Sequence, residues 1–319
     1  MSATERSNVV IGTRGSPLAL WQARWVQGDL ERLHPGLSVS LEIIKTTGDK
    51  ILDVPLAQVG GKGLFVKEIE EALLEGRVDL AVHSMKDVPA VLPEGVFIAV
   101  VPRREDPRDV LVSRDGAGLR DLRQGARVGT SSLRRIFQLR FQRTDLEIVP
   151  LRGNIDTRLR KVGEGELDAV VLAAAGIRRM GWEDRITEYL SLDVSLPAVG
   201  QGALGIECRI GDSRVLNLLH PLDDPETHLC VTAERAFLTR LEGGCQVPIA
   251  GHARLEAGVL RIEGRVSDLE GKLLIREQLE GNPSDSSDLG LDLAERLLEQ
   301  GAAEILKEVY GRAKGSPDR

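Results

Sequence analysis

The chain carries one strand–turn–helix plan in two places, and this repeat constrains the fold more than any other feature. Residues 10–16 (VIGTRGS) read as a strand, a Gly-Thr turn and a serine that caps a helix, and residues 127–132 (RVGTSS) repeat that order. Residues 75–79 (EGRVD) are echoed by residues 164–168 (EGELD), where a helix end leads into an apolar strand. We therefore expect two similar α/β lobes, each built on an open, mainly parallel sheet.

The two predicted lobes are interleaved along the chain. Crossings are expected near residues 101–103 and 197–202, and the apolar segment 203–209 (ALGIECR) reads as a strand that returns to the first lobe. The predicted domains are residues 1–102 with 202–221 for the first lobe, 103–201 for the second, and 222–319 for a small α+β domain.

The third domain and one long loop complete the predicted organisation. Segments 249–255, 259–268 and 272–279 alternate in polarity like strands of a small antiparallel sheet, and residues 289–310 have the period of one long amphipathic helix. Residues 45–62 are rich in Gly, Lys and Asp, so we predict a mobile loop there and interpret it as a lid.

The composition excludes several classes of protein. Only ten aromatic residues occur, so the cores must be aliphatic, and no apolar run approaches the ~18 residues of a membrane span. The first residues lack the basic and apolar regions of a secretion signal, and the three cysteines suggest neither a disulfide framework nor a zinc site. We therefore expect a cytoplasmic protein with no metal and no membrane contact.

The charge is unevenly distributed. The net charge of -7 argues against a general nucleic-acid binder, yet residues 120–161 contain eleven basic and only four acidic residues. Ten of the eleven are arginine, whose donor fork fits carboxylate or phosphate. Arg14, Arg134, Arg135 and Arg152 fall at or near predicted strand ends, where open sheets bind ligands, so we expect a polyanionic small molecule in a cleft.

Two short segments carry candidate chemistry. Residues 83–89 (HSMKDVP) end a buried strand and place Asp87 where it either caps a turn or stabilises a developing cation and moves a proton. Cys245 lies between two glycines and Pro248, and it is either an inert turn cysteine or a presented nucleophile or attachment point. A two-lobed anion receptor without chemistry and an RNA-binding protein using residues 120–161 are the alternatives to an enzyme.

Taken together, seven segments in order along the chain resemble the porphobilinogen deaminase (hydroxymethylbilane synthase) family. They are residues 12–19 (GTRGSPLA), 60–65 (GGKGLF), 83–89 (HSMKDVP), 129–135 (GTSSLRR), 151–154 (LRGN), 197–202 (PAVGQG) and 243–248 (GGCQVP). The resemblance implies two lobes like type II periplasmic binding proteins and a third domain. It also implies a monomeric transferase of tetrapyrrole biosynthesis that joins four porphobilinogen molecules into linear hydroxymethylbilane and releases ammonia.

The same resemblance assigns residues. It implies a dipyrromethane cofactor bound to Cys245 through a thioether, and catalytic roles for Asp87 and Lys86. The implied contacts to the cofactor, beyond these three, are Ser84, Thr130, Ser132, Arg134, Arg135, Arg152 and Gly153. The implied contacts to the substrate are Arg14, Ser16, Lys62, Arg158, Arg179 and Gln201. Gln58 departs from the lysine expected in many members of the family.

Overall fold

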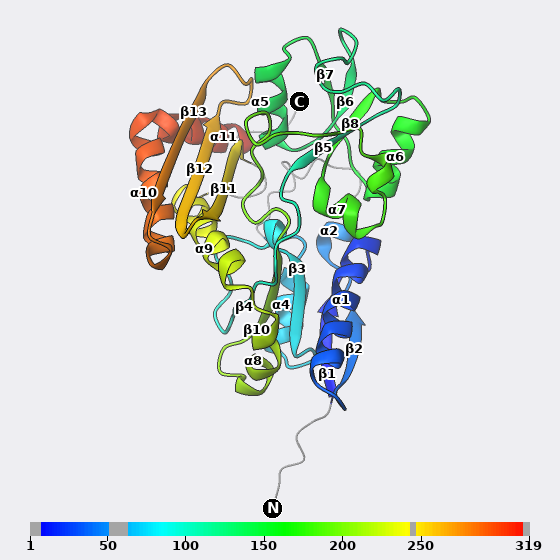
Figure 1. The fold of residues 1–319 in the computed structure, drawn as a ribbon, viewed down its shortest axis with the longest axis vertical. Coiled ribbons are helices and arrows are strands. Elements are labelled where there is room, and N and C mark those ends of the chain that lie inside the picture. The colour runs from blue at the N-terminus through cyan, green and yellow to red at the C-terminus, as the bar shows by residue number, and fades with distance from the viewer. Residues whose placement is uncertain (1–7, 51–62, 243–246, 315–319) are drawn as a thin grey trace, which may run out of the picture. The chain divides into compact units, whose positions relative to one another are not determined.

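The computed structural model describes residues 8–50, 63–242 and 247–314, which form two compact units (Figure 1). The first unit, here called the first lobe, comprises the described residues of 1–104 together with 203–228. The second unit comprises the described residues of 105–202 and 229–319. It contains a second open sheet, the second lobe, and a three-stranded C-terminal sheet. The predicted α/β class with a small C-terminal domain is confirmed, whereas the three domain boundaries stay predictions.

The first lobe contains a mixed five-stranded sheet with the order β2-β1-β3-β10-β4. β1 is parallel to β2 and β3, whereas β10 is antiparallel to β3 and β4. The predicted return strand at 203–209 is confirmed as β10, although its antiparallel direction was not part of that prediction. The strands are β1 (Asn8–Thr13), β2 (Ser38–Ile43), β3 (Leu80–Ser84), β4 (Val96–Val100) and β10 (Leu204–Arg209).

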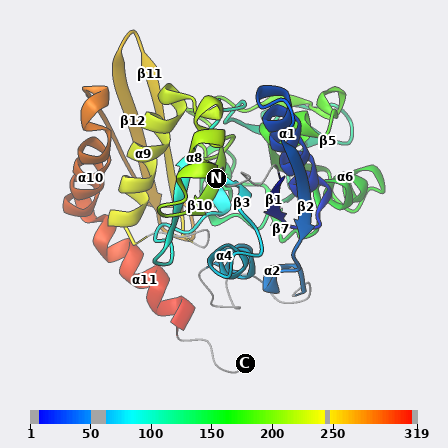
Figure 2. The ribbon, with the colours of Figure 1, turned by 90° about the horizontal axis from the view of Figure 1, so that it is seen from below.

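Helices cover both faces of this sheet (Figure 2). Ala23, Val26 and Leu30 of α1 (Pro17–Leu33) are buried on one face together with α8 (Ser213–Leu219), and α4 (Lys67–Leu74) packs on the other face. Apolar residues three and four apart give α1 its buried stripe. Three shorter elements complete the lobe: α2 (Thr47–Lys50) and the 3-10 turns η1 (Met85–Asp87) and η3 (His220–Leu222).

The second lobe repeats the first in topology, with the order β7-β6-β8-β5-β9. β6 is parallel to β7 and β8, and β5 is antiparallel to β8 and β9. The strands are β5 (Asp109–Ser113), β6 (Arg127–Gly129), β7 (Glu147–Val149), β8 (Ala169–Ala173) and β9 (Glu188–Tyr189). The helical segments are α5 (Leu133–Gln142), α6 (Ile155–Gly163), α7 (Ala174–Arg179) and the 3-10 turn η2 (Glu183–Arg185).

The glycine of each Gly-Thr turn has the same packing reason in both lobes. Gly12 is in register with Ala81 on the neighbouring strand, and Gly129 is in register with Val170. A Cβ at Gly12 would lie 3.1 Å from Val78, and one at Gly129 would lie 2.6 Å from Leu167. The predicted repeat is therefore confirmed residue by residue, and Ala81 and Val170 are equivalent positions.

The C-terminal sheet is antiparallel, as predicted, with the order β11-β12-β13. Phe237 is fully buried against it, because Gly251 and Gly264 leave room for the ring. Its strands are β11 (Ile249–Glu256), β12 (Val259–Ser267) and β13 (Leu274–Gly281). Its helical segments are α9 (Pro225–Arg240), which begins in the first lobe, the 3-10 turn η4 (Pro283–Asp285), α10 (Ser286–Leu297) and α11 (Ala303–Lys314).

Two sequence predictions were wrong in part. The single helix expected over 289–310 is interrupted by the π-helical turn η5 (Leu298–Ala302), because Gly301 adopts a left-handed φ of 106°. The loop expected over 45–62 contains the short helix α2, and its remaining residues from 51 onwards lie outside the described part of the chain. Within the described residues, every helix is too short or too polar to span a lipid bilayer.

Candidate functional site

In the first lobe the candidate residues follow β1 and β3, at the edge where these parallel strands end. Ser16 is the N-cap of α1, and its Oγ accepts a hydrogen bond from the Ala19 N–H at 3.3 Å. Arg14 forms an ion pair with Asp49, with Nη2 2.5 Å from Oδ1, and stacks on the ring of Phe65. Burial alone would raise the pKa of Asp49, but Arg14 and neighbouring donors lower it below its ordinary value. Arg14 is therefore held in place by a carboxylate of the chain itself.

The end of β3 presents Asp87 on a short, well-anchored turn. Ser84 Oγ accepts a hydrogen bond from the side chain of Gln22 at 2.8 Å, and the Met85 N–H donates to the carbonyl of Ala203 at 3.0 Å. Met85 is buried, while Lys86 and Asp87 are partly exposed. Among the described residues, the Asp87 carboxylate has no hydrogen bond or ion pair, so its oxygens are available to a ligand.

The turn after β6, which is equivalent to the Arg14 turn after β1, presents hydroxyl groups. Ser131 connects the end of β6 to the end of β7, because its Oγ donates to the Leu151 carbonyl and accepts from the Leu151 N–H. The buried Thr130 Oγ1 accepts a hydrogen bond from the Ser132 N–H at 3.2 Å. Ser132 is the N-cap of α5, but its side chain forms no hydrogen bond to the helix. The turn thus holds hydroxyls beside a helix N-terminus, a combination that favours anions.

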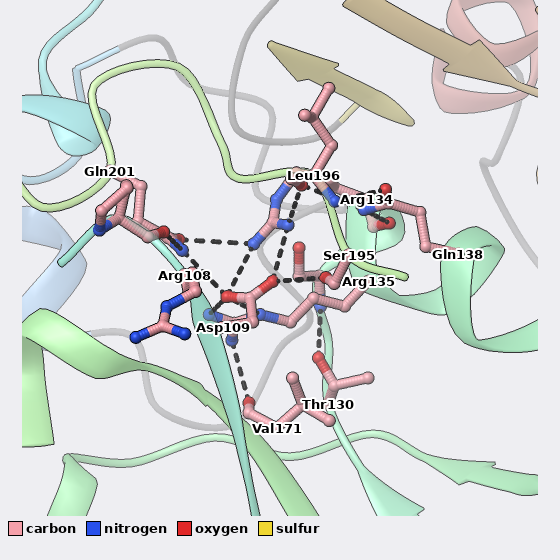
Figure 3. A network of polar contacts seen from close by, with 12 residues as sticks. Arg108, Asp109, Thr130, Arg134, Arg135, Gln138, Val171, Ser195, Leu196 and Gln201 are labelled. Carbon is pink, nitrogen blue, oxygen red and sulfur yellow. Dashed lines mark hydrogen bonds and ion pairs between the residues drawn. The ribbon is translucent and has the colours of Figure 1, made fainter. Parts of the chain in front are cut away.

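Asp109 is the centre of a buried polar network in the second lobe (Figure 3). It opens β5 and accepts hydrogen bonds from Arg134 Nη1 at 2.7 Å and from Arg135 Nη2 at 2.8 Å. Ser195 Oγ and Gln201 Nε2 donate to the same carboxylate at 2.7 and 2.9 Å. Burial by itself would raise the pKa of Asp109, but the two guanidinium groups outweigh burial and hold it well below its usual range.

Both arginines of this network have further partners. Arg134 donates to the Leu196 carbonyl at 2.6 Å, and Arg135 donates to the Val171 carbonyl at 3.0 Å. Their side chains are only 5% and 7% exposed. Two cations share one carboxylate, so the network keeps one net positive charge beneath the strand ends. Arg134 and Arg135, which were expected to bind a polyanionic ligand, are thus already bound to a carboxylate of the chain itself.

The remaining predicted residues of the second lobe lie in the turn after β7, on α6 and α7, and in the segment before β10. Gly153 has a φ of 101°, and a Cβ there would lie 2.9 Å from Thr157, so the turn after Arg152 requires glycine. Arg158 Nε donates to the Gly153 carbonyl at 2.8 Å. Arg179 donates to the Gly202 carbonyl at 2.7 Å, and burial lowers its pKa to about 10.

The structure therefore gathers the predicted site residues into two groups, one in each unit. Arg14, Ser16, Ser84, Lys86 and Asp87 belong to the first lobe. The second group consists of Thr130, Ser132, Arg134, Arg135, Arg152, Gly153, Arg158, Arg179 and Gln201. Cys245, Lys62 and Gln58 lie outside the described residues.

The basic stretch 120–161 is partly neutralised by acidic groups that lie beyond it in sequence. Asp168 pairs with Arg123 at 2.7 Å, and Asp109 pairs with two arginines as above. Glu164 and Glu166 pair with Arg160 and Lys161. Tertiary structure thus supplies acidic partners to five of the eleven basic residues of this stretch.

Two open sheets of one topology, each with cationic and hydroxyl side chains where its parallel strands end, define an α/β protein that binds small polyanions. Models of known protein families match the sequence over most of its length. A model of the dipyrromethane cofactor binding domain of porphobilinogen deaminase matches residues 9–217, and a model of the C-terminal domain of porphobilinogen deaminase matches residues 228–299. The chain belongs to the porphobilinogen deaminase family.

Curated relatives agree with this assignment. The porphobilinogen deaminase of Syntrophobacter fumaroxidans is 59% identical over 94% of this chain and 97% of its own length. That of Syntrophotalea carbinolica is 61% identical over 93% of this chain and 94% of its own. Among solved structures, the periplasmic aliphatic sulphonate binding protein of Escherichia coli has a TM-score of 0.40 and 15% identity over 75% of this chain and 71% of its own.

The family establishes the reaction and the cofactor. The chain is a transferase that polymerises porphobilinogen into hydroxymethylbilane, and it uses dipyrromethane as its cofactor. Each dipyrromethane ring carries an acetate and a propionate, so the donors needed are cations and hydroxyls. The strand-end residues fit that need: Ser132 has a hydroxyl that its own helix does not use, and Arg152 is partly exposed in the same lobe.

Asp109, Ser195 and Ser131 were not among the residues predicted from the sequence. Asp109 is a single acidic residue at the start of an apolar strand (DVLVS), and this local signal could have marked it as buried and paired. Ser195 is 86 residues from Asp109 in sequence, so no local pattern connects them.

Proposed function

We propose that Asp87 is the catalytic carboxylate of this transferase and that Cys245 carries its cofactor through a thioether. The single observation that carries the proposal for Asp87 is its carboxylate at the end of β3, which is partly exposed and forms no bond to any described residue. A carboxylate committed to a structural ion pair, such as Asp109, could not serve in this way.

The chemistry of porphobilinogen explains why a carboxylate is needed. When its aminomethyl arm loses ammonia with the bonding electron pair, the pyrrole nitrogen shares the positive charge that remains. A carboxylate near that N–H stabilises the cation, and electrostatic stabilisation of this kind commonly contributes more to catalysis than any other single effect. When bound, dipyrromethane supplies the nucleophilic pyrrole carbon to which the first unit is joined. We propose that Asp87 then assists the loss of the proton from the newly joined ring carbon.

The remaining site residues are proposed to bind carboxylates of the cofactor and substrate. Charge-assisted hydrogen bonds contribute roughly 1.5–3 kcal/mol each, so a few cations per ring suffice. The proposed cofactor contacts, beyond Cys245, are Ser84, Lys86, Asp87, Thr130, Ser132, Arg134, Arg135, Arg152 and Gly153. The proposed substrate contacts are Arg14, Ser16, Lys62, Arg158, Arg179 and Gln201. Lys86 is also proposed to assist Asp87 in catalysis.

Arg134 and Arg135 are proposed to act in a second way as well. Because both are bonded to Asp109, they supply net positive charge from below and fix the first turn of α5, which bears Ser132 at its N-cap. The two arginines then attract the carboxylates of the cofactor by long-range electrostatics as well as by direct contact.

We also propose that the enzyme works as a monomer in the cytoplasm. Cys208 and Cys230 are buried, and neither forms a disulfide bond with another described residue, which is compatible with a reducing compartment. Light scattering after size-exclusion chromatography tests the monomer, and a mass twice that of the chain would contradict it.

The experiment for the catalytic role is the variant Asp87→Asn. We expect kcat to fall by about 10²–10⁴ with a much smaller change in KM, because the charge is removed while the shape is kept. Asp29→Asn is the matched control, since Asp29 belongs to an exposed pair with Arg32 in the same lobe. Wild-type turnover by Asp87→Asn, with intact cofactor by mass, would remove Asp87 from its role.

A further inference from the structure

Three ionisable side chains are buried together in the first lobe, between α4 and the sheet. His83 Nε2 on β3 lies 3.0 Å from Glu207 Oε2 on β10, and these side chains are 4% and 1% exposed. Glu70 on α4 is 7% exposed and interacts electrostatically with both. Within the described residues, Oε1 of Glu70 and Oε1 of Glu207 have no hydrogen-bond partner. Such unsatisfied buried oxygens are costly, so the cluster calls for an explanation.

The second lobe shows that the fold does not require this cluster. The matching registers make His83 equivalent to Leu172, and Glu207 equivalent to Val112. The ends of α4 and α6 match as well, because the N–H of Gly76 donates to the Leu73 carbonyl and the N–H of Gly165 donates to the Val162 carbonyl. Counting back three residues from each carbonyl makes Glu70 equivalent to Leu159. Those three second-lobe residues are Leu159, Leu172 and Val112, and they are buried together in one apolar core. The same architecture is thus stable with hydrocarbon at all three positions.

The formal charges of the three side chains do not balance one another. Even a protonated His83 could balance only one of the two carboxylates. Burial, followed by the neighbouring charge of Glu207, raises the pKa of Glu70 to about 7, so Glu70 carries that proton below neutrality. The cluster therefore changes its charge within the physiological pH range.

The other charged groups around Glu70 do not offset this change. Arg209 on β10 is committed to the carbonyls of Leu73 and Val78 and to Asp212. Glu71 on the same helix adds negative charge and pairs with Lys67 at 3.8 Å. The two other strands that contact α4, namely β1 (NVVIGT) and β4 (VFIAV), contain no charged residue.

The cluster lies directly before the Asp87 turn. His83 is opposite Gly205 in the β3–β10 ladder, and Ser84 is opposite Leu204. Met85 packs so closely on Gly205 that a Cβ there would lie 2.9 Å from its methyl group. The His83–Glu207 bond and the Met85 contact together hold the first residues of the turn on β10. A second buried negative charge at Glu70 would repel Glu207 and disturb this pairing.

We propose that Glu70, His83 and Glu207 are positioning residues that hold the Asp87 turn in its working geometry only while one proton is bound among them. Loss of that proton loosens the β3–β10 pair at its end and misplaces Asp87. Turnover therefore declines as pH rises through the ionisation of the cluster, while binding of porphobilinogen is largely unaffected. This inference rests on the role proposed for Asp87.

The first test is spectroscopic and does not depend on catalysis. Infrared difference spectra of the holoenzyme are recorded between about pH 5.5 and 8.5, for the wild type and for Glu70→Gln. We expect the band of a protonated buried carboxyl group in the wild type, disappearing with a midpoint near neutrality and missing in Glu70→Gln. A wild type without that band, or a band that survives in Glu70→Gln, would overturn the proposal even if the variant proved unstable.

The second test measures kcat and KM for porphobilinogen over the same pH range. We expect kcat of the wild type to fall on the alkaline side at the spectroscopic midpoint, with KM changing less than about 2-fold. Glu70→Gln should lose this decline, and Glu71→Gln, on the exposed side of the same helix, should keep it. An unchanged pH profile in Glu70→Gln contradicts the proposal, whereas full activity of Asp87→Asn would instead remove the role of Asp87.

A third variant copies the second lobe into the first. The triple change Glu70→Leu, His83→Leu and Glu207→Val should fold, as judged by circular dichroism, because the equivalent core is apolar. We expect its kcat to fall about 10-fold or more, since misplacement of a catalytic group by ~1 Å is sufficient for such a loss. Wild-type kcat in the folded triple variant would show that the cluster does not position the turn.

Discussion

Arg134 Nη1 lies 2.7 Å from Asp109 Oδ2, and this ion pair is almost completely withdrawn from water. Asp109 also accepts hydrogen bonds from Arg135, Ser195 and Gln201, so one carboxylate satisfies donors from three separate segments of the second unit. Removing this carboxylate leaves two buried cations without a compensating charge. Breaking a buried ion pair is most costly when it leaves such an uncompensated charge.

Asp109→Asn should therefore lower the free energy of unfolding by about 3–5 kcal/mol. Urea unfolding of the purified protein at neutral pH measures this loss. Glu164→Gln is the control, because its exposed pair with Arg160 contributes less than about 1 kcal/mol. A loss in Asp109→Asn no larger than in Glu164→Gln would show that the network is not a stabilising centre.

The coupling between Arg134 and Asp109 can be isolated by a double-mutant cycle. With Arg134→Gln and Asp109→Asn, we expect a coupling energy of about 1–3 kcal/mol, because the partners share a buried site. The corresponding cycle for Arg160 and Glu164 should give roughly 0.5 kcal/mol or less. Additive effects at the buried pair would contradict the direct interaction.

Stability should decline as pH rises between about 4.5 and 7 because of the raised pKa of Glu70. Its pKa is raised from 4.5 to about 7, so its contribution is full below the unfolded value and is lost as pH rises through the folded one. The loss amounts to about 3 kcal/mol between these limits. Thermal unfolding of Glu70→Gln should show a flatter pH dependence than the wild type, whereas Glu71→Gln should not. Equal slopes for all three proteins would argue against a titrating Glu70.

Cys245→Ser should yield protein that has the mass of the bare chain and no transferase activity, because a hydroxyl does not form the thioether. Intact-mass spectrometry and a colour reaction for pyrroles provide the measurement. Cys208→Ser and Cys230→Ser are the controls, and both should retain the added mass of dipyrromethane. Normal turnover by Cys245→Ser would refute the role of Cys245 as the attachment point of the cofactor. A fully active wild type with the mass of the bare chain would refute covalent attachment altogether.

The parts of the fold that could be predicted from the sequence are those with a local cause. Gly12 and Gly129 mark equivalent turns because a side chain would be crowded by the core at Gly12 and would collide with it at Gly129, and both turns were found from sequence. The strand at 203–209 was recognised from its apolar run, but its direction and central place in the sheet depend on pairing with distant strands.

The parts that were missed have non-local causes. Glu207 is an ordinary polar residue in the segment ALGIECR, and it is buried only because β10 enters the middle of the sheet under α4. The arginines of 120–161 looked unbalanced because their acidic partners, among them Asp109 and Asp168, lie outside that stretch. Asp87 was identified correctly as following β3, yet its lack of partners within the described chain is visible only in three dimensions.

The insertion of β10 between β3 and β4 has a consequence for the order in which the two lobes fold during synthesis. Until residue 209 has emerged, β3 and β4 have no strand between them, so the first lobe must wait for a segment made after the whole second lobe. The second lobe needs only residues 109–189 for its sheet and can close earlier. We infer that synthesis leaves the N-terminal segment of the first lobe open and accessible to chaperones, in contrast to the usual N-terminal-first order.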